Sequence, residues 1–180
     1  MKKKGKVVTS VKKNGKTVTP CKTKVIYLDN NGTTKLCKEA KNAMILWLES
    51  RANPSSDSII SKKSKELMEC SRKYMLKHCS VNENKYTALF TSGASESNCF
   101  IIRSVVEAYK INTGKKPHII TSATEHKSII KCCSSLNENG YASITYIEPN
   151  AYGCINPELI NRAITPQTAL ISIMSANNEL

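Results

Sequence analysis

A sequence of 180 residues is long enough for one ordinary globular domain and too short for two of full size. With 40% hydrophobic and 23% charged residues it is neither a disordered nor a collagen-like chain, and 8 cysteines are too few for a small disulfide scaffold. No apolar run is long enough to cross a bilayer, and the lysine-rich start lacks the apolar stretch of a signal peptide. We therefore expect a cytoplasmic protein without a membrane span.

The net charge of +13 is concentrated at the N-terminus. Residues 1–24 contain nine lysines and no acidic residue, whereas residues 25–180 contain 18 Lys and Arg against 14 Asp and Glu. This division predicts a basic extension over 1–24 and a body over 25–180. The extension is either an electrostatic contact with nucleic acid or anionic lipid, or a solubilising tail. Its lack of interleaved aromatic or arginine residues favours the tail.

The cysteines suggest reduced thiols rather than disulfides or a metal centre. None of them forms a C-x-x-C pair, and the adjacent Cys132 and Cys133 have poor geometry for a mutual disulfide. His126 with Cys132, or His78 with Cys79, would each give two metal ligands. Neither pair is accompanied by a second pair at zinc spacing, so we expect no metal site.

Residues 7–19 predict a β-hairpin. Two β-prone runs flank Asn14-Gly15, a pair that readily accepts the positive φ angles of a type I′ turn. Pro20 marks the boundary with the body, where residues 25–28 (VIYL) predict a short strand.

Two helices are expected next. Apolar residues at helical spacing from Leu36 to Trp47 predict the first, with Thr33 or Thr34 as its cap and Trp47 in the core. After the interruption at 53–56, a similar spacing predicts a second helix over 60–76.

From residue 86 onward, β-prone runs alternate with helical patterns. Successive units of this length predict a parallel sheet with right-handed crossovers, covered by helices, and thus an α/β fold. The expected strands and helices are, in order, 86–90, about 95–111, 118–121, about 127–136, 143–147, 157–163 and 169–174.

Ligands of parallel α/β sheets bind at the carboxyl ends of the strands, so the loops at those ends are candidate sites. Residues 91–97 (TSGASES) combine small residues with the free N–H groups of a helix start, which favours a phosphate, and Ser95 adds a hydroxyl. An ordinary helix cap at Ser95 is the alternative. The loop matches neither a Walker A sequence nor G-x-G-x-x-G, which argues against nucleoside triphosphates and dinucleotides.

Two further loops carry candidate side chains. His126 follows the strand at 118–121, where an imidazole could stack on a flat ligand or shuttle a proton, although a lone histidine is often structural. Asn177 follows the last strand, where an amide could orient a polar ring substituent or simply form a turn.

Five motifs occur in order along residues 25–180, namely 27–34 (YLDNNGTT), 53–56 (NPSS), 90–98 (FTSGASESN), 124–127 (TEHK) and 172–179 (SIMSANNE). Their order and spacing resemble the NifS-like cysteine desulfurases, which are pyridoxal 5′-phosphate (PLP) enzymes of the class-V aminotransferase group. The resemblance implies a parallel sheet like that of fold type I PLP enzymes, with its large domain incomplete.

The resemblance also implies roles for individual residues. Ala94 and Ser95 match the loop that holds the cofactor phosphate, with Ser95 replacing the family's threonine. His126 matches the histidine that stacks on the pyridine ring and assists proton transfer. Asn177 matches the asparagine that reaches the ring oxygen. Two further departures are Gly32 for alanine and Ser58 for histidine.

Other functional residues of the family have no match in this sequence. The aspartate that holds the pyridinium nitrogen, the Schiff-base lysine and the sulfur-accepting cysteine lie, in the family, beyond the position of Leu180. Lys127 belongs to the motif of the stacking histidine, and neither Cys132 nor Cys133 matches the sulfur acceptor. We therefore expect the N-terminal half of a desulfurase, truncated before the catalytic residues and inactive as an isolated chain.

Three functional hypotheses follow. The first is a homodimeric desulfurase that converts L-cysteine to L-alanine with transfer of sulfur, represented by its N-terminal half. The second is a catalytically inactive, truncated relative that binds a partner or nucleic acid through residues 1–24. In the third, a separate chain supplies the missing half.

Overall fold

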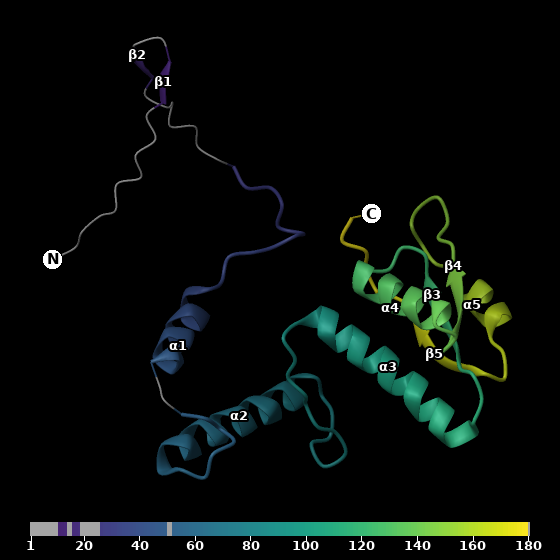
Figure 1. Ribbon diagram of the computed structural model, residues 1–180, viewed down its shortest axis with the longest axis horizontal. Helices are drawn as coiled ribbons and strands as arrows, with labels where there is room; N and C mark the ends of the chain where they lie inside the picture. The colour runs from purple at the N-terminus through teal and green to yellow at the C-terminus, as the bar shows by residue number, and fades with distance from the viewer. Residues whose placement is uncertain (1–10, 14–15, 19–25, 50–51, 180) are drawn as a thin grey trace. The chain divides into compact units, whose positions relative to one another are not determined.

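The computed structural model describes residues 11–13, 16–18, 26–49 and 52–179 (Figure 1). The chain divides into two compact units, Met1–Cys37 and Lys38–Leu180, and each is described by itself. Helices and strands alternate through most of the second unit, which contains the parallel sheet.

The first unit contains the predicted hairpin. Strands β1 (Val11–Lys13) and β2 (Lys16–Val18) pair antiparallel, with Lys13 opposite Lys16. This register leaves a two-residue connection, as expected for Asn14-Gly15, which itself lies outside the described residues.

The strand predicted at 25–28 is wrong for residues 26–28, and Val25 lies outside the described residues. The segment turns back on itself instead, because the Tyr27 hydroxyl donates to Thr33 O at 3.2 Å and Thr33 N donates to Asp29 O at 3.3 Å. A β-prone run becomes a strand only where another strand pairs with it.

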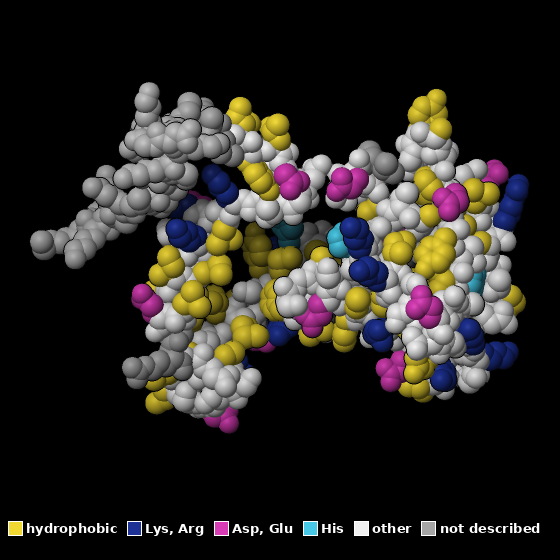
Figure 2. Space-filling view, turned by 45° about the horizontal axis from the view of Figure 1, so that its top comes forward, with side chains coloured by type: hydrophobic (Ala, Val, Ile, Leu, Met, Phe, Trp, Pro, Cys, Tyr) yellow, Lys and Arg dark blue, Asp and Glu magenta, His cyan; other side chains and the backbone are white. Residues whose placement is uncertain are grey.

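The second unit begins with two helices, α1 (Lys38–Leu48) and α2 (Ile59–His78). Helix α1 starts at Lys38, so the predicted cap at Thr33 or Thr34 is wrong. It buries no residue, and Trp47 is only half-buried rather than in the core. In α2 only Ser61 and Ser64 are buried, and large apolar side chains of both helices are exposed (Figure 2).

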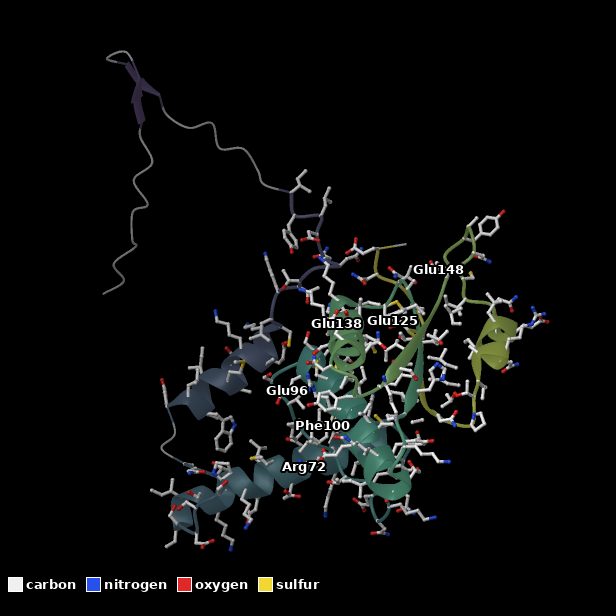
Figure 3. The ribbon with its side chains drawn as sticks, turned by 45° about the vertical axis from the view of Figure 1, so that its right-hand side comes forward. Arg72, Glu96, Phe100, Glu125, Glu138 and Glu148 are labelled. Atoms are coloured by element: carbon white, nitrogen blue, oxygen red, sulfur yellow. The ribbon has the colours of Figure 1, made fainter. Side chains whose placement is uncertain are left out.

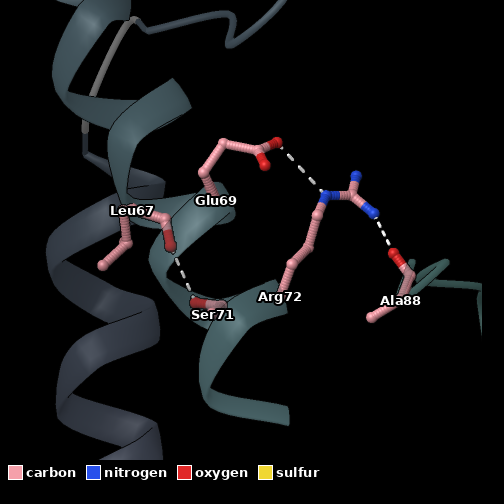
Figure 4. A network of polar contacts seen from close by, with 5 residues as sticks. All are labelled: Leu67, Glu69, Ser71, Arg72 and Ala88. Carbon is pink, nitrogen blue, oxygen red and sulfur yellow. Dashed lines mark hydrogen bonds and ion pairs between the residues drawn. The ribbon is translucent and has the colours of Figure 1, made fainter. Parts of the chain in front are cut away.

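The strand predicted at 86–90 is also absent, and Arg72 supplies the reason. This α2 residue (Figure 3) donates from Nη1 to Ala88 O, so the carbonyl is bonded by a side chain rather than by a neighbouring strand. The Arg72 guanidinium lies 5.2 Å from the centre of the Phe90 ring, and its Nε lies 3.3 Å from Glu69 Oε1 (Figure 4).

The predicted parallel sheet is confirmed in its last three strands. These are β3 (His118–Ser122), β4 (Ser143–Ile147) and β5 (Thr168–Ser172), in the spatial order β4-β3-β5 and all parallel (Figure 1). Three helices accompany them, α3 (Ala94–Thr113), α4 (Lys127–Glu138) and α5 (Pro157–Ala163). Because α4 leads to one side of β3 and α5 leads back to the other, right-handed crossovers place them on opposite faces.

The core lies between the sheet and the helix pair α3 and α4. Ile119 of β3 is opposite Ile144 of β4 and Leu170 of β5, so the three side chains share one face of the sheet. From the helices, buried residues pack against this face, namely Ile102, Val106, Ile129, Cys132, Cys133 and Leu136. Each large aliphatic side chain buried here contributes about 1.5–3 kcal/mol to folding.

His118, at the start of β3, is buried on the opposite face. Its Nδ1 lies 2.9 Å from Thr168 Oγ1 on β5, and its Nε2 lies 2.8 Å from Thr145 Oγ1 on β4. Burial lowers the pKa of this imidazole, because the charged form loses its hydration. His118 therefore links all three strands at the end of the sheet away from the candidate site.

Candidate cofactor site

Helix α3 begins with exposed backbone at the predicted phosphate loop. Gly93 is the N-cap and contributes no side-chain hydrogen bond, so the predicted cap at Ser95 is wrong. Ala94 and Ser95 are the first helical residues, and N–H groups at this position have no acceptor within the helix. Apart from Gly93 and its two chain neighbours, no atom of the described residues lies within 4 Å of the place a Cβ would take at Gly93, so a ligand has room to approach the backbone.

Contacts within the loop hold it in shape. Thr91 Oγ1 lies 2.7 Å from Ser97 Oγ, and Ser92 N donates to Glu96 Oε2 at 2.6 Å. The hydrogen bonds from Ser92 lower the pKa of Glu96, so its carboxylate is charged near the positive end of the helix dipole. Glu96 thus takes up the Ser92 amide and leaves the amides of Ala94 and Ser95 as the donors at this helix start.

His126 caps α4 in the loop that follows β3. Its Nδ1 accepts from Ser128 N at 3.1 Å and lies 2.8 Å from Ser128 Oγ. Asn98 Nδ2, on α3, donates to the same hydroxyl at 2.9 Å. This chain of polar contacts fixes the imidazole and links the first turns of the two helices.

Ser95 and His126 line one groove between the starts of α3 and α4, with a volume of about 440 Å³. Both side chains are exposed, so their polar groups are open to a ligand. We call this the α3–α4 groove, and it is lined by Ser95, Cys99, Arg103, His126, Lys127, Ser128, Lys131, Cys132 and Ser135. The structure therefore brings together two of the loops that the sequence singles out.

Asn177 lies beside the same β3 loop but in a different hollow. Its Nδ2 donates to Thr124 O at 2.9 Å and its Oδ1 accepts from Glu179 N at 2.7 Å. With Ser122 and Thr124 it lines a pocket of about 500 Å³ at the ends of β3 and β5. The half-buried amide is thus anchored to the loop that carries His126, while it does not line the α3–α4 groove.

Glu125 is a positioning residue that the sequence analysis missed. Its Oε1 accepts from Ser122 Oγ at 2.9 Å and from Met174 N at 2.7 Å (Figure 3). The carboxylate therefore joins the loop after β3 to the loop after β5, and so holds His126 and Asn177 in a fixed relation. The signals in the sequence are an acidic residue within a strand-end loop and its place in the motif at 124–127.

The chain has an α/β fold with polar loops and hollows at the carboxyl ends of its parallel strands, the place where ligands of such sheets bind. Residues 26–180 match the model of the aminotransferase class-V family, and the chain belongs to that family. The resemblance proposed from the five motifs is thereby confirmed.

Curated relatives are cysteine desulfurases. The chain is 38% identical over 158 residues to cysteine desulfurase IscS of Methanosarcina thermophila. The aligned residues cover 87% of this chain and 38% of the relative. It is 37% identical over 157 residues to the putative cysteine desulfurase NifS of Bacillus subtilis, covering 86% and 38%. The chain thus spans about two fifths of the length of these relatives.

Solved structures agree with the sequence relatives. A structure titled NifS-like protein superposes with a TM-score of 0.75 at 30% identity, covering 83% of this chain and 40% of that one. A structure titled SspA in complex with cysteine gives 0.74 at 32% identity, covering 83% and 42%. These matches confirm the α/β fold predicted from the alternating elements.

The family is PLP-dependent, and the residues present fit this cofactor. Two helix-start amides with open space above Gly93 suit a phosphate, and an exposed imidazole in the same groove suits a flat ring. Within the part of the chain that the structure describes, no three His, Cys, Asp or Glu side chains cluster as metal ligands. Over the same residues, no helix combines the length and apolar character needed to span a membrane.

Proposed function

We propose that Ala94, Ser95, His126 and Asn177 bind PLP, and that the activity to which they contribute is that of a cysteine desulfurase. This reaction converts L-cysteine to L-alanine and transfers the sulfur. The observation that carries the proposal is the α3–α4 groove, where Ser95 and His126 meet in a chain whose relatives are cysteine desulfurases.

Each residue has a task that follows from its surroundings. The amides of Ala94 and Ser95, with the Ser95 hydroxyl, donate to the phosphate at the positive end of the α3 dipole. His126 presents its ring to the pyridine face and is held by the contact of Nδ1 with Ser128. Bound PLP supplies the electron sink that the chemistry requires.

Asn177 completes the proposed set from the loop after β5. Its Nδ2 donates to Thr124 O and Glu125 joins the two loops, which supports a place for Asn177 beside the loop that carries His126, and in this proposal the amide contacts the cofactor oxygen from there. The same proposal includes L-cysteine as substrate. It also includes a homodimer, which the exposed apolar side chains of α1 and α2 support as an interface.

The test is noncovalent binding of pyridoxine 5′-phosphate to the full chain. This compound lacks the aldehyde of PLP, so it cannot react with the many lysines and reports only the phosphate and ring contacts. We expect saturable binding by equilibrium dialysis that excess inorganic phosphate competes away. Ser95→Ala removes one hydrogen bond to a charged group and should weaken binding roughly 10-fold.

The controls are a serine and a histidine outside the α3–α4 groove. Ser134→Ala, on α4, and His78→Ala, on α2, should bind as the unaltered chain does, whereas His126→Ala should bind more weakly. Absence of saturable binding, or equal losses in the site and control variants, would contradict the proposal.

The nine lysines of residues 1–24 support a second candidate function, binding to nucleic acid. If it is correct, fluorescence anisotropy with a labelled duplex should show binding that weakens steeply as salt rises, and deletion of 1–24 should abolish it. Salt-independent binding, or binding unchanged by the deletion, would contradict it.

A further inference from the structure

Thiols gather where α3 packs against α4. Cys99 lies on α3, and Cys132 and Cys133 lie on α4 as members of the hydrophobic core. The exposed fractions of Cys132 and Cys133 are 4% and 0%, whereas Cys99 is half-buried. One thiol of this cluster therefore reaches solvent while its neighbours are enclosed.

Cys99 and Cys132 line the same groove between α3 and α4, together with Arg103. Cys99 packs against the hydrophobic cluster that contains Cys132. Cys99 Sγ lies 3.9 Å from Ser128 O at the start of α4. Packed helices with axes about 8–10 Å apart bring facing Cα atoms to roughly 4–6 Å, which is the separation a disulfide spans.

Both thiols line the α3–α4 groove, whose charged lining residues are Arg103, Lys127 and Lys131. No carboxylate lines this groove. The charged side chains that line the groove around the two thiols are therefore all positive.

The three cysteines differ in exposure to solvent, and their expected reactivity differs accordingly. Burial raises the pKa of Cys132, against the lowering effect of Arg103, and raises the pKa of Cys133 to about 11. Both buried thiols are thus protonated at neutral pH. Cys99, which opens into the groove, is the thiol that a dissolved oxidant meets first.

We propose that Cys99 and Cys132 are an oxidation site that closes into a reversible disulfide on reaction with a hydroperoxide. The Cys99 thiolate attacks a peroxide oxygen, the O–O bond breaks, and the leaving oxygen takes a proton to give an alcohol or water. Cys99 becomes a sulfenic acid. The Cys132 sulfur then attacks the Cys99 sulfur, the S–S bond forms, the S–O bond breaks and water leaves.

The step balances, because two thiols lose two electrons and two protons while one hydroperoxide is reduced. Its structural effect follows from the position of the bond. Cys99 lies one helical turn after Ser95, so the disulfide joins the starts of α3 and α4 close to the groove. This inference does not depend on PLP binding.

The test is to treat the full chain with hydrogen peroxide and map its peptides without reduction. Cleavage with trypsin and a Glu-specific protease gives Ser97–Arg103 with Cys99 and Cys132–Glu138 with the other two thiols. We expect these peptides as one disulfide-linked species that dithiothreitol separates. Fragmentation between Cys132 and Cys133 assigns the link to Cys132.

Single variants make the assignment falsifiable. Cys99→Ala and Cys132→Ala should abolish the linked species, whereas Cys133→Ala, in the same peptide, and exposed Cys154→Ala should keep it. Circular dichroism identifies a variant that fails to fold. The peptide map of the unaltered chain tests the proposal even where a variant does not fold. A link through Cys133, a link between two chains, or irreversible oxidation of Cys99 alone would overturn the proposal.

Discussion

The segment Lys38–His78, with α1 and α2, differs sharply from the segment Ala94–Ser172, with α3 to β5. Both contain helices whose apolar residues recur at helical spacing. Among the described residues of the first, the only buried side chains are those of two serines, whereas the second holds every member of the hydrophobic core. Amphipathic spacing therefore makes a helix, but burial requires a partner surface, which the parallel sheet provides.

Single side chains show the size of this difference. Ile102 of α3 is 1% exposed, whereas Ile60 of α2 is 67% exposed, although both are helical isoleucines. Because apolar burial is the main favourable term in folding, the stability of the described chain comes mostly from the sheet and its helices. The candidate cofactor site lies at the edge of that stable part.

The largest expected effect tests this contrast directly. Ile102→Ala removes a buried side chain and leaves a cavity, so the free energy of unfolding should fall by about 2–5 kcal/mol. Ile60→Ala should change it by less than about 0.5 kcal/mol. Urea denaturation followed by circular dichroism measures both. Similar losses in the two variants would show that α2 is buried in solution, contrary to the structure.

The next effect concerns the loops that form the site. Glu125→Ala deprives the buried Ser122 hydroxyl and the Met174 amide of their acceptor, which should cost about 1.5–3 kcal/mol. Glu148→Ala, at an exposed carboxylate (Figure 3), is the matched control and should cost less than about 0.5 kcal/mol.

Glu125→Gln separates the hydrogen bonds from the negative charge, because the amide oxygen can still accept. We expect it to lose less stability than Glu125→Ala and to keep the Met174 amide protected from hydrogen exchange. If Glu125→Ala left that protection unchanged, the carboxylate would not be joining the two loops.

The sequence predicted the segment from α3 to β5 well because each local pattern there agrees with the tertiary structure. Strands β3, β4 and β5 each pair with a parallel neighbour, and helices alternate with them in the predicted order. The strands expected at 25–28 and 86–90 failed for a nonlocal reason. Among the described residues no strand pairs with 26–28, which lead into a turn at 30–32, and the carbonyl of Ala88 accepts a hydrogen bond from Arg72.

The sequence identified the candidate site residues, but it did not show how they are arranged in space. Loop position and motif resemblance identified Ser95, His126 and Asn177. That the first two share a groove while Asn177 lies in another depends on how α3 packs on α4, which no local pattern encodes. Glu125 was missed because its partner Met174 is 49 residues away in the sequence.

A smaller effect should appear in the pH dependence of stability. The folded pKa of His118 lies below its unfolded value of about 6.5, so below that pH the unfolded chain binds more protons than the folded one. Stability from this residue is therefore complete above pH ~6.5 and is lost as the pH falls toward the folded pKa, by at most about 1.4 kcal/mol per pH unit.

His118→Gln should remove this component from a series of urea denaturations between pH 5 and 8, a range set by the histidine pKa of about 6.5. His78→Gln, at an exposed histidine on α2, should leave the pH profile of the unaltered chain in place. The account fails if His118→Gln retains the full pH dependence or if both variants change it equally.

The smallest effect compares the helix caps of the two segments. His126 Nδ1 caps α4 by accepting from Ser128 N, and Ser58 Oγ caps α2 by accepting from Ser61 N at 3.3 Å. Because α4 is part of the core, His126→Ala should lower the free energy of global unfolding by about 1 kcal/mol, whereas His126→Asn, which keeps an acceptor, should lose only a few tenths.

Ser58→Ala should instead increase hydrogen exchange in the first turn of α2 with little change in global unfolding, since α2 buries no large apolar side chain. Equal global losses from the two caps would mean that both helices unfold with the same core, and the contrast between the segments would not hold.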